Sequence, residues 1–422
     1  MPRDYLLPLL SVCLFVIQLG LSVSDLPSIK LMQDIVCRHV HRIDSPELLP
    51  EEKCRDEPVQ QRLNFIMMGM QISATISATL VAFPLGVLSD RISRLPVLGA
   101  RILSMILSQS YAMFVRWKSD MIPLEAIWCI GVALLFGGGR SVAEAMWVMA
   151  SGLAAQLEGP VLSVELVQSS VWMPLFLSLG LVLGGGITLV SIGPYDYGLE
   201  SNMLSLESLK RTSVMVAFKS MFSRPLLRLI PGTVMTIPLA TVQTDIAIRL
   251  MPIQFSGPLN RSILIVSLPS LVTLLTLCIL LPVITCIWSK LTRSPTHRRC
   301  SNLACASSLL FLAGCLCMMM VTKEAFIVAG LAVSALGSGL PTLCRSMLVR
   351  MTGDERAGML FGLLAVCEIL GLLACEASMG ALFGVGLKTW LGMPFCLGTA
   401  ASLVISLTTW LVPTKLLNTG DG

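Results

Sequence analysis

The amino-acid sequence predicts an all-α membrane protein with about twelve transmembrane helices. Of its 422 residues, 55% are hydrophobic and only 13% are charged. The apolar residues come in runs of about twenty, which is the length that an α-helix needs to cross roughly 30 Å of hydrocarbon. Basic residues gather in alternate loops between these runs, as they do in proteins that cross a bilayer repeatedly. Function is thereby limited to transport, sensing or enzymology inside a membrane.

The expected helices are read from eleven apolar segments and one doubtful stretch. The first segment could also be a signal peptide, because a basic start precedes it, but its apolar core is long and no small-residue cleavage site closes it. The doubtful stretch, 148–171, is shorter and only moderately apolar. The eleven segments are 6–23, 64–88, 96–116, 124–147, 172–192, 228–248, 263–288, 303–321, 325–348, 357–383 and 391–412.

The charge of each loop predicts the side of the membrane that it faces. The longest loop, 24–63, contains six Lys/Arg and eight Asp/Glu and is assigned to the outside. The loops 89–95, 193–227 and 289–302 are basic and are assigned to the cytoplasm. Both termini are then expected to be cytoplasmic.

The predicted sides of the loops decide whether the doubtful stretch, 148–171, crosses the membrane. The loop near Arg116 is expected outside and the loop near Lys210 inside, so an odd number of crossings must separate them. The clear segments between these loops supply two. A third crossing within 148–171 is therefore required, and twelve spans follow.

A weak internal repeat with an offset of 200 residues divides the chain into two halves. The run from Phe136 to Gly139 aligns with the run from Leu336 to Gly339, and the sequence after Trp172 resembles the sequence after Trp390. Two repeated six-helix halves are a recurrent plan of secondary transporters, with the substrate site between them. The expected organisation is an N-terminal half at 1–192, a cytoplasmic linker at 193–227 and a C-terminal half at 228–422.

The two halves differ in length. From Gly337 to Trp390 is 53 residues, whereas from Gly137 to Trp172 is 35, a shortfall of 18. Eighteen residues make about 27 Å of helix, nearly a full crossing. The sequence therefore predicts that the fifth helix is short or incomplete.

The turn after the second helix carries a motif. It reads Gly86-Val-Leu-Ser-Asp90-Arg91-Ile-Ser-Arg94-Leu and is similar to the G-x-x-x-D-R-x-G-R-[KR] signature of the major facilitator superfamily, with Ser93 in place of glycine and leucine in place of the last basic residue. The resemblance implies a gating role for Gly86, Asp90, Arg91 and Arg94, in which the charges form a latch across the cytoplasmic face. The alternative is an ordinary cytoplasmic turn.

Four further stretches resemble the fungal branch of the superfamily, which is related to drug and tetracycline antiporters and to proton-coupled folate transporters. They are Gln33–Arg38, Cys54–Gln60, Ala335–Gly339 and Cys344–Ser346. The resemblance implies solute transport by alternating access and fixes no substrate.

Charged residues inside the spans are candidates for the transport pathway or for proton coupling, because each costs about 2.5–3.5 kcal/mol at a helix centre. Arg140 and Glu144 are four residues apart, as are Asp245 and Arg249, so each pair can neutralise itself on one helix face. Structural pairing is the alternative for both. The candidates are Arg140, Glu144, Asp245, Arg345, Glu368 and Glu376.

Glu368 and Glu376 have no obvious partner on their own helix. They lie eight residues apart, or about 80° around the axis, so both can face one cavity. A carboxyl group in a low dielectric can hold a proton at neutral pH, as coupling requires. Glu368, nearer the middle of the bilayer, is predicted to be the stronger proton carrier. The alternative is a protonated acid with no transport role.

The remaining chemistry is sparse. Only Cys37 and Cys54 share the outside loop, which predicts a disulfide between them. The sequence contains no phosphate-binding glycine loop, zinc spacing or hydrolase arrangement, so neither an enzyme nor a metal or cofactor site is expected. The net charge of +5 is explained by the inside loops and requires no nucleic acid.

The sequence therefore predicts a monomeric, multi-pass, secondary active transporter of a small organic solute, coupled to protons, in the plasma or vacuolar membrane. The alternative is a transporter-shaped protein that senses or no longer carries solute, because the region of the fourth and fifth helices is shortened.

Overall fold

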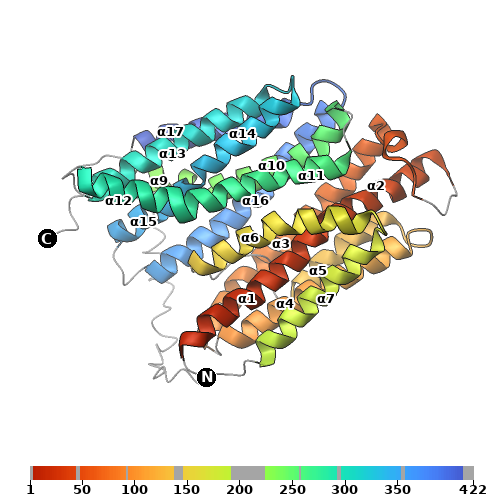
Figure 1. Ribbon diagram of the computed structural model, residues 1–422, viewed down its shortest axis with the longest axis horizontal. Coiled ribbons are helices and arrows are strands. Elements are labelled where there is room, and N and C mark those ends of the chain that lie inside the picture. The colour runs from red at the N-terminus through yellow and green to blue at the C-terminus, as the bar shows by residue number, and fades with distance from the viewer. Residues whose placement is uncertain are drawn as a thin grey trace.

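The computed structural model describes residues 3–43, 48–91, 94–136, 146–191, 224–255, 258–291, 296–352 and 357–411. Within these ranges the chain forms helices and no strand. The helices run alongside one another in a single elongated bundle (Figure 1). Eleven long helical rods and one shorter segment follow in order, which is an all-α membrane fold.

The first three rods are α1–α2, α3 and α4. Helix α1 (Arg3–Val23) continues after a break at Ser24 into α2 (Asp25–His41). A short 3-10 turn, η1 (Glu51–Cys54), leads to the 35-residue helix α3 (Glu57–Arg91). Helix α4 (Arg94–Trp117) follows.

The outside segment 24–63 was predicted to be a loop, and this is wrong for most of its length. Residues 25–41 are α2, and α3 begins at Glu57, seven residues before the expected span. Helix α2 buries Leu31, Met32 and Ile35 against the bundle, and also Asp34, which pairs with Arg38. Charged residues interspersed with the apolar ones lower the mean hydropathy of α2, so it does not stand out as a span.

The fourth to sixth rods test the prediction that the fifth helix is short or incomplete. The 3-10 turn η2 (Leu124–Cys129) and α5 (Ile130–Leu134) form a short rod, and α6 (Met146–Val167) and α7 (Trp172–Ser191) follow. Helix α6 has 22 residues, about 33 Å, so the prediction that the fifth helix is short or incomplete is wrong.

Part of the shortfall precedes Met146, the first described residue of α6. In the sequence, seventeen residues, 340–356, separate Gly339 from Ala357, whereas six residues, 140–145, separate Gly139 from Met146. Eleven of the eighteen residues are therefore missing between Gly139 and Met146.

The second half of the chain contributes six rods, several of them interrupted. The fourth of the six rods carries two labels, α14 and α15, because a 3-10 turn, η4 (Gly337–Gly339), interrupts it. A π-turn, η3 (Thr276–Leu280), interrupts the rod α11–α12. The helices are α9 (Arg224–Val234), α10 (Thr236–Phe255), α11 (Leu259–Leu275), α12 (Leu281–Leu291), α13 (Thr296–Met319), α14 (Glu324–Leu336), α15 (Leu340–Thr352), α16 (Ala357–Gly386) and α17 (Met393–Trp410).

Glycines allow α13 and α14 to pack closely. A Cβ placed on Gly314 would lie 2.4 Å from the backbone nitrogen of Ser334, and one placed on Gly330 would lie 2.8 Å from the carbonyl oxygen of Gly314. Small residues at helix crossings let backbones approach, which is the common basis of helix association in membranes.

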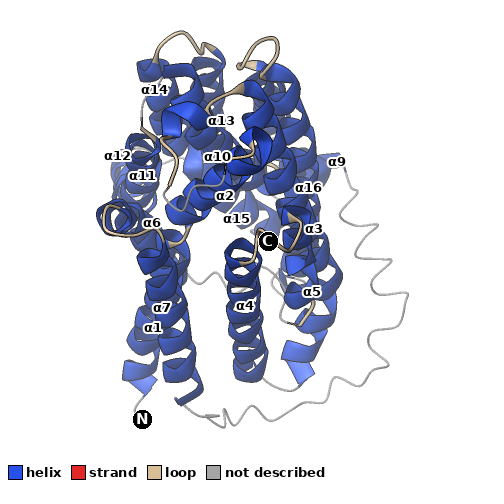
Figure 2. Cartoon of the chain, turned by 90° about the vertical axis from the view of Figure 1, so that its right-hand side faces the viewer, coloured by secondary structure: helices blue, strands red, loops and turns tan. Residues whose placement is uncertain are grey.

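Helices from the two parts of the sequence meet along two seams. Helix α3 packs against α16, and α6 packs against α11. In the end view these seams lie on opposite sides of the bundle, with α13 and α14 above and α1, α4 and α7 below (Figure 2). Most of 193–227, the expected linker, lies outside the described residues.

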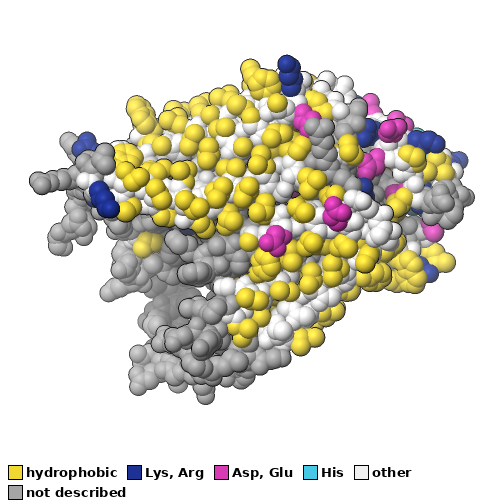
Figure 3. All heavy atoms as spheres, viewed as in Figure 1, with side chains coloured by type: hydrophobic (Ala, Val, Ile, Leu, Met, Phe, Trp, Pro, Cys, Tyr) yellow, Lys and Arg dark blue, Asp and Glu magenta, His cyan; other side chains and the backbone are white. Residues whose placement is uncertain are grey.

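The surface matches a membrane protein. Nine described segments are long and apolar enough to cross a bilayer. Hydrophobic side chains cover the middle of the visible face, and charged ones gather at the end that carries α2 (Figure 3). The segment Ser267–Trp288 buries only 6% of its most apolar window inside the protein, so it faces lipid.

Candidate functional site

A polar hollow lies where α3, α10 and α16 meet. Its empty volume, which includes space open to solvent, is about 310 Å³. Because α10 and α16 come from the second half of the chain and α3 from the first, the hollow lies on a seam. We call it the central hollow; it is lined by Asn64, Met67, Met68, Gln71, Val242, Asp245, Ile246, Arg249, Glu376 and Gly380.

Arg249 and Asn64 join the three helices. The Arg249 guanidinium donates to the Asn64 side-chain oxygen at 3.1 Å and, through Nε, to the backbone oxygen of Asp245 at 3.3 Å. Asn64 in turn donates to the backbone oxygen of Gly380 at 3.0 Å. The guanidinium carbon lies 5.6 Å from the centre of the Phe383 ring, within the range of a cation–π contact. One asparagine on α3 therefore contacts both α10 and α16.

The sequence prediction paired Asp245 with Arg249 on one helix face. The two residues interact electrostatically, and the closest contact described between them is to the Asp245 backbone. Arg249 therefore also reaches the other half of the chain, which the sequence did not predict.

Glu376 faces α3 across the seam. The Thr75 hydroxyl donates to its carboxylate at 2.9 Å and also lies 2.9 Å from the backbone oxygen of Gln71. Because this hydrogen bond joins the two halves, it would break if the halves moved apart.

Glu368 has a different neighbour. Its carboxylate lies 2.7 Å from the guanidinium of Arg345 on α15, and both side chains are about one fifth exposed. The sequence had found no partner for Glu368 on its own helix; the partner comes from the preceding helix in the same half. The Arg345–Glu368 ion pair therefore joins two helices of the same half.

Several predicted site residues lie outside what the structure describes. Arg140 and Glu144 fall in 137–145. For the turn motif only the backbone is described: Gly86, Asp90 and Arg91 lie at the end of α3, and Arg94 begins α4.

The sequence reasoning missed Asn64, Gln71 and Thr75. They are uncharged, so a search for charges in the spans passed over them. Their spacing of seven and four residues places them on one face of a helix, and that polar stripe was the signal that could have found them.

A second hollow adjoins the first on the side of α2. Arg249 lines both hollows, so it connects them. We call the second one the outer hollow; it is lined by Ile29, Gln33, Arg55, Gln60, Leu63, Arg249, Pro252 and Ile253.

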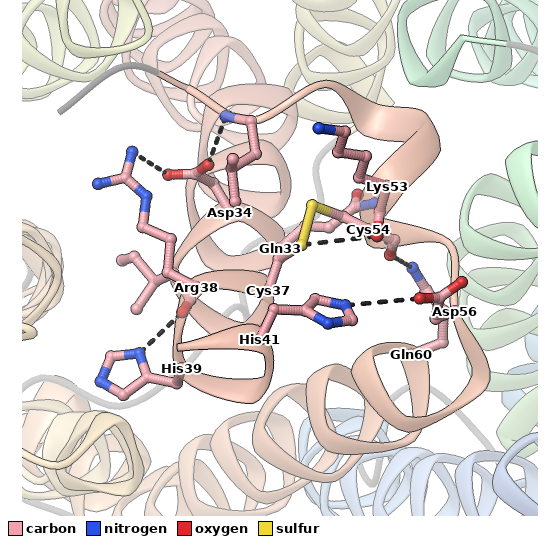
Figure 4. Close-up of a disulfide and its surroundings, with 12 residues drawn as sticks. Gln33, Asp34, Cys37, Arg38, His39, His41, Lys53, Cys54, Asp56 and Gln60 are labelled. Atoms are coloured by element: carbon pink, nitrogen blue, oxygen red, sulfur yellow. Dashed lines mark hydrogen bonds and ion pairs between the residues drawn. A yellow bond between two sulfur atoms is a disulfide. The ribbon is translucent and has the colours of Figure 1, made fainter. Parts of the chain in front are cut away.

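A disulfide closes the segment above the outer hollow. Cys37 of α2 is joined to Cys54 of η1, with their Cα atoms 5.4 Å apart (Figure 4). The side-chain amides of Gln33 and Gln60 both donate to the backbone oxygen of Cys54, at 3.3 and 2.8 Å. We call α2, η1 and the chain between them the outer cap.

Ion pairs on the same cap hold its acidic residues. Asp34 pairs with Arg38 at 2.8 Å and accepts from the backbone N–H of Leu49 at 2.9 Å. His41 lies 3.5 Å from Asp56 (Figure 4). No group of three or more His, Cys, Asp or Glu side chains in the described ranges could hold a metal ion.

Comparison with known sequences finds fungal transport proteins. The chain is 23% identical to the MFS efflux pump atnC of Emericella nidulans over 92% of its own length and 85% of that protein's length. It is 20% identical to the efflux pump ustT of Aspergillus flavus, over 79% of this chain and 73% of that one. No model of a known protein family matches the chain.

Comparison with solved structures finds the same fold. The human organic anion transporter MFSD10 superposes with a TM-score of 0.58 at 13% identity, covering 97% of this chain and 100% of that one. A D-xylose–proton symporter superposes with a TM-score of 0.57 at 14% identity, covering 96% and 98%. At such identity the likeness concerns the fold alone.

Proposed function

We propose that this chain is a secondary active carrier of a small organic solute. Its curated relatives and its fold support a transporter of the major facilitator superfamily of fungal type. The observation that carries the proposal is the central hollow. Charged and amide side chains from both halves meet there, inside segments that otherwise contain mostly apolar residues. Ionisable groups at such a depth usually mark a pathway for substrate or ions.

The contacts that close the hollow suit alternating access. The bonds from Asn64 to Arg249 and to Gly380, and from Thr75 to Glu376, all cross from one half to the other. Each hydrogen bond contributes about 0.5–1.5 kcal/mol net, so a few can hold one state without trapping it. Rocking of 1–192 against 228–422 would break them together and open the hollow.

For the coupling ion we propose a proton carried by Glu376. Its carboxylate contacts a hydroxyl on the opposite half, so its protonation and the closing of the seam can influence each other. Glu368 contacts a guanidinium within its own half, which favours a fixed charge.

For the direction of transport we propose export, because two of the relatives are named as efflux pumps. The termini and the turn at Gly86–Arg94 would then face the cytoplasm, the outer cap would face away from it, and the membrane would be the plasma or vacuolar one. In this arrangement the turn motif stabilises one of the two states.

The alternative, a sensor or a carrier that has lost its activity, depends on a shortened region of the fourth and fifth helices. Helix α6 has the length of a full crossing and packs against both α1 and α11. This length favours the carrier; residues 137–145, before α6, lie outside the described ranges.

A transport assay with matched variants tests the proposal. Inside-out vesicles from a strain that expresses the chain receive a mixture of small organic solutes under an imposed pH gradient, and accumulation is read by mass spectrometry. We expect at least one solute to accumulate with the gradient and not after a protonophore is added. Thr75→Val should reduce this accumulation. Thr79→Val should leave it unchanged, because the Thr79 hydroxyl bonds only to its own helix among the contacts described.

No difference between expressing and empty vesicles for any solute, at matched protein level, would count against transport. Equal effects of the two threonine variants would count against the seam as the site of coupling.

A further inference from the structure

The second half of the chain has two hydrophobic cores, one nearer the outer cap and one nearer the opposite end of the bundle, where α12 and α15 lie (Figure 1). Each of the six rods of this half contributes to both cores. The first, which we call the cap-side core, is represented rod by rod by Leu239, Ile265, Phe311, Ile327, Met379 and Phe395. The second, the far-side core, is represented in the same order by Leu229, Leu281, Leu303, Leu343, Leu364 and Ile405.

Between its two contributions, every rod carries a buried residue that is small or bears a hydroxyl. Three of these residues stand at the midpoints of α13, α16 and α17. We call the set the polar layer; it consists of Thr236, Thr276, Ser307, Ser334, Gly371 and Ser402. The hydroxyls of Thr236 and Thr276 donate to backbone oxygens four residues back, at 2.8 and 2.7 Å, a contact that often bends a helix. The two cores are therefore joined through residues that have little volume to interlock.

Two rods depart from α-helical geometry at this layer. In η3 the Leu281 N–H donates to the oxygen of Thr276, five residues back, and in η4 the Leu340 N–H donates to the oxygen of Gly337, three residues back. The next residue in each rod is a proline, Pro282 or Pro341, which has no N–H to continue the ladder. Interruptions of this kind in the middle of a helix often mark a hinge.

The two interruptions lie against each other. Turn η3 contacts η4, and a Cβ placed on Gly339 would lie 2.9 Å from the side chain of Leu281. The Ser338 hydroxyl in η4 is buried and has no hydrogen-bond partner in the described part of the chain. A buried hydroxyl without a partner is rare in a settled structure, and a different arrangement of the two turns could satisfy it.

A third rod is weakened at the same level. Pro238 has no N–H to donate to the backbone oxygen of Val234, four residues back, where α9 ends. Gly371 of α16 faces this oxygen, because a Cβ on the glycine would lie 3.3 Å from it. Prolines therefore interrupt three of the six rods near the polar layer.

We infer that the second half bends at the polar layer, so that α9, α12 and α15 swing with the far-side core while the cap-side core keeps its contacts with α3. This movement goes beyond the rocking of whole halves, because it changes the shape of one half. It would open and close the end of the bundle away from the cap while the bonds of Asn64 and Thr75 across the seam stay in place. Only its use in transport rests on the proposed function.

Distances within the second half test the inference on the full chain in lipid nanodiscs. Nitroxides are attached to an azide-bearing amino acid introduced by codon suppression, so the native cysteines stay in place, and pulsed electron paramagnetic resonance measures each pair. Ile287 of α12 and Phe326 of α14 lie on opposite sides of the layer, whereas Leu397 of α17 and Phe326 both lie on the cap side, and all three side chains are exposed. We expect two distance components for the first pair and one for the second.

Pro282→Ala supplies the missing N–H and should favour the straight form of its rod. One net hydrogen bond changes the ratio of two forms by about two- to tenfold, so the ratio of the two components of the Ile287–Phe326 pair should shift by that factor. The melting temperature shows whether the variant is folded.

Pro269→Ala is the matched control. Pro269 lies in the same rod, seven residues before η3, and is exposed like Pro282. The bond that this variant restores lies on the cap side of the layer, so the ratio should stay unchanged. One component for both pairs would overturn the inference, as would equal shifts in the two proline variants.

The transport assay separates this inference from the proposed function. Two components that respond to Pro282→Ala, in a protein that accumulates no solute, would support the bend while contradicting the carrier. Accumulation of a solute by a protein with a single component for both pairs would overturn the bend and leave a carrier with rigid halves.

Discussion

Two glutamates on α16 show how the neighbours of a residue decide its role. Glu368 and Glu376 are eight residues apart on one helix and have the same chemistry. Glu368 lies beside a guanidinium, whereas Glu376 accepts from a hydroxyl across the seam. The first arrangement stabilises a fixed negative charge, and the second leaves protonation open to a change in the distance between helices.

We therefore predict opposite outcomes for two substitutions. Glu376→Gln imitates the protonated acid permanently, so it should abolish accumulation driven by a pH gradient and retain solute exchange. Glu368→Gln should lower stability by about 3 kcal/mol, because it removes one member of a shielded ion pair. Accumulation in vesicles and melting temperature in detergent measure the two effects.

Replacing both members of the ion pair, Arg345→Met with Glu368→Leu, should recover much of the stability. Lost coupling in Glu368→Gln with normal coupling in Glu376→Gln would reverse the assignment.

At this scale the sequence identified the charged residues and could not pair them. Arg345 and Glu368 were both candidates, yet they are 23 residues apart on different helices, so helix periodicity gives no sign of their contact. Asn64 was missed because it carries no charge, although it contacts both helices of the other half at the central hollow.

Among the helices, α13 and α14 depend on glycine at their crossing. We predict that Gly314→Ala destabilises the protein by about 1–3 kcal/mol, because the new methyl group would lie 2.4 Å from the backbone of α14, which cannot move aside locally. Gly180→Ala is the control, since nothing lies within 4 Å of its added carbon. It should leave stability unchanged or raise it by up to about 1 kcal/mol, because alanine favours a helix. Thermal unfolding in one detergent compares them, and an equal loss in both would contradict the close-packing argument.

The stability of the outer cap depends on its disulfide. The bridge closes a segment of 17 residues, so removing it should cost about 3 kcal/mol. We expect Cys37→Ser with Cys54→Ser to lower the melting temperature, and reductant to lower it in the wild type and not in the double variant. On intact cells, an impermeant maleimide should label a cysteine introduced into the cap without permeabilisation. In cells that carry the protein in the plasma membrane, labelling only after permeabilisation would show that the cap faces the cytoplasm.

The elements also show the limit of hydropathy. Where both ends are described, the sequence analysis found the long apolar spans to within seven residues at each end; for example, 96–116 is α4 (Arg94–Trp117) and 172–192 is α7. It missed α2, whose charged residues lower its mean hydropathy, and it assigned the shortfall to the fifth helix because the length of a repeat does not reveal which of its parts is short.

For the whole molecule, the seam between α3 and α16 is the place to test movement of the halves. A Cβ on Gly380 would lie 3.8 Å from the Cβ of Met68, the usual separation in a disulfide. We predict that Met68→Cys with Gly380→Cys forms a bridge on oxidation, stops transport, and recovers with reductant. A protease site in the linker 193–227 reveals the bridge, because the two fragments then stay together on a non-reducing gel. Each single variant, oxidised in parallel, is the control. Full transport in the bridged protein would show that this seam need not open.

The outer cap also has a practical use in imaging this protein. From Arg3 to His41 the rod α1–α2 measures about 58 Å, so its far end stands well clear of a hydrocarbon layer of roughly 30 Å. Leu26 and Ile29, at the start of α2, belong to an apolar cluster with Ile248 of α10, so the base of the cap rests on the other half. A disulfide-closed projection of this kind is a ready epitope. An antibody fragment selected against it would bind clear of the segments that face lipid and serve as a marker for imaging.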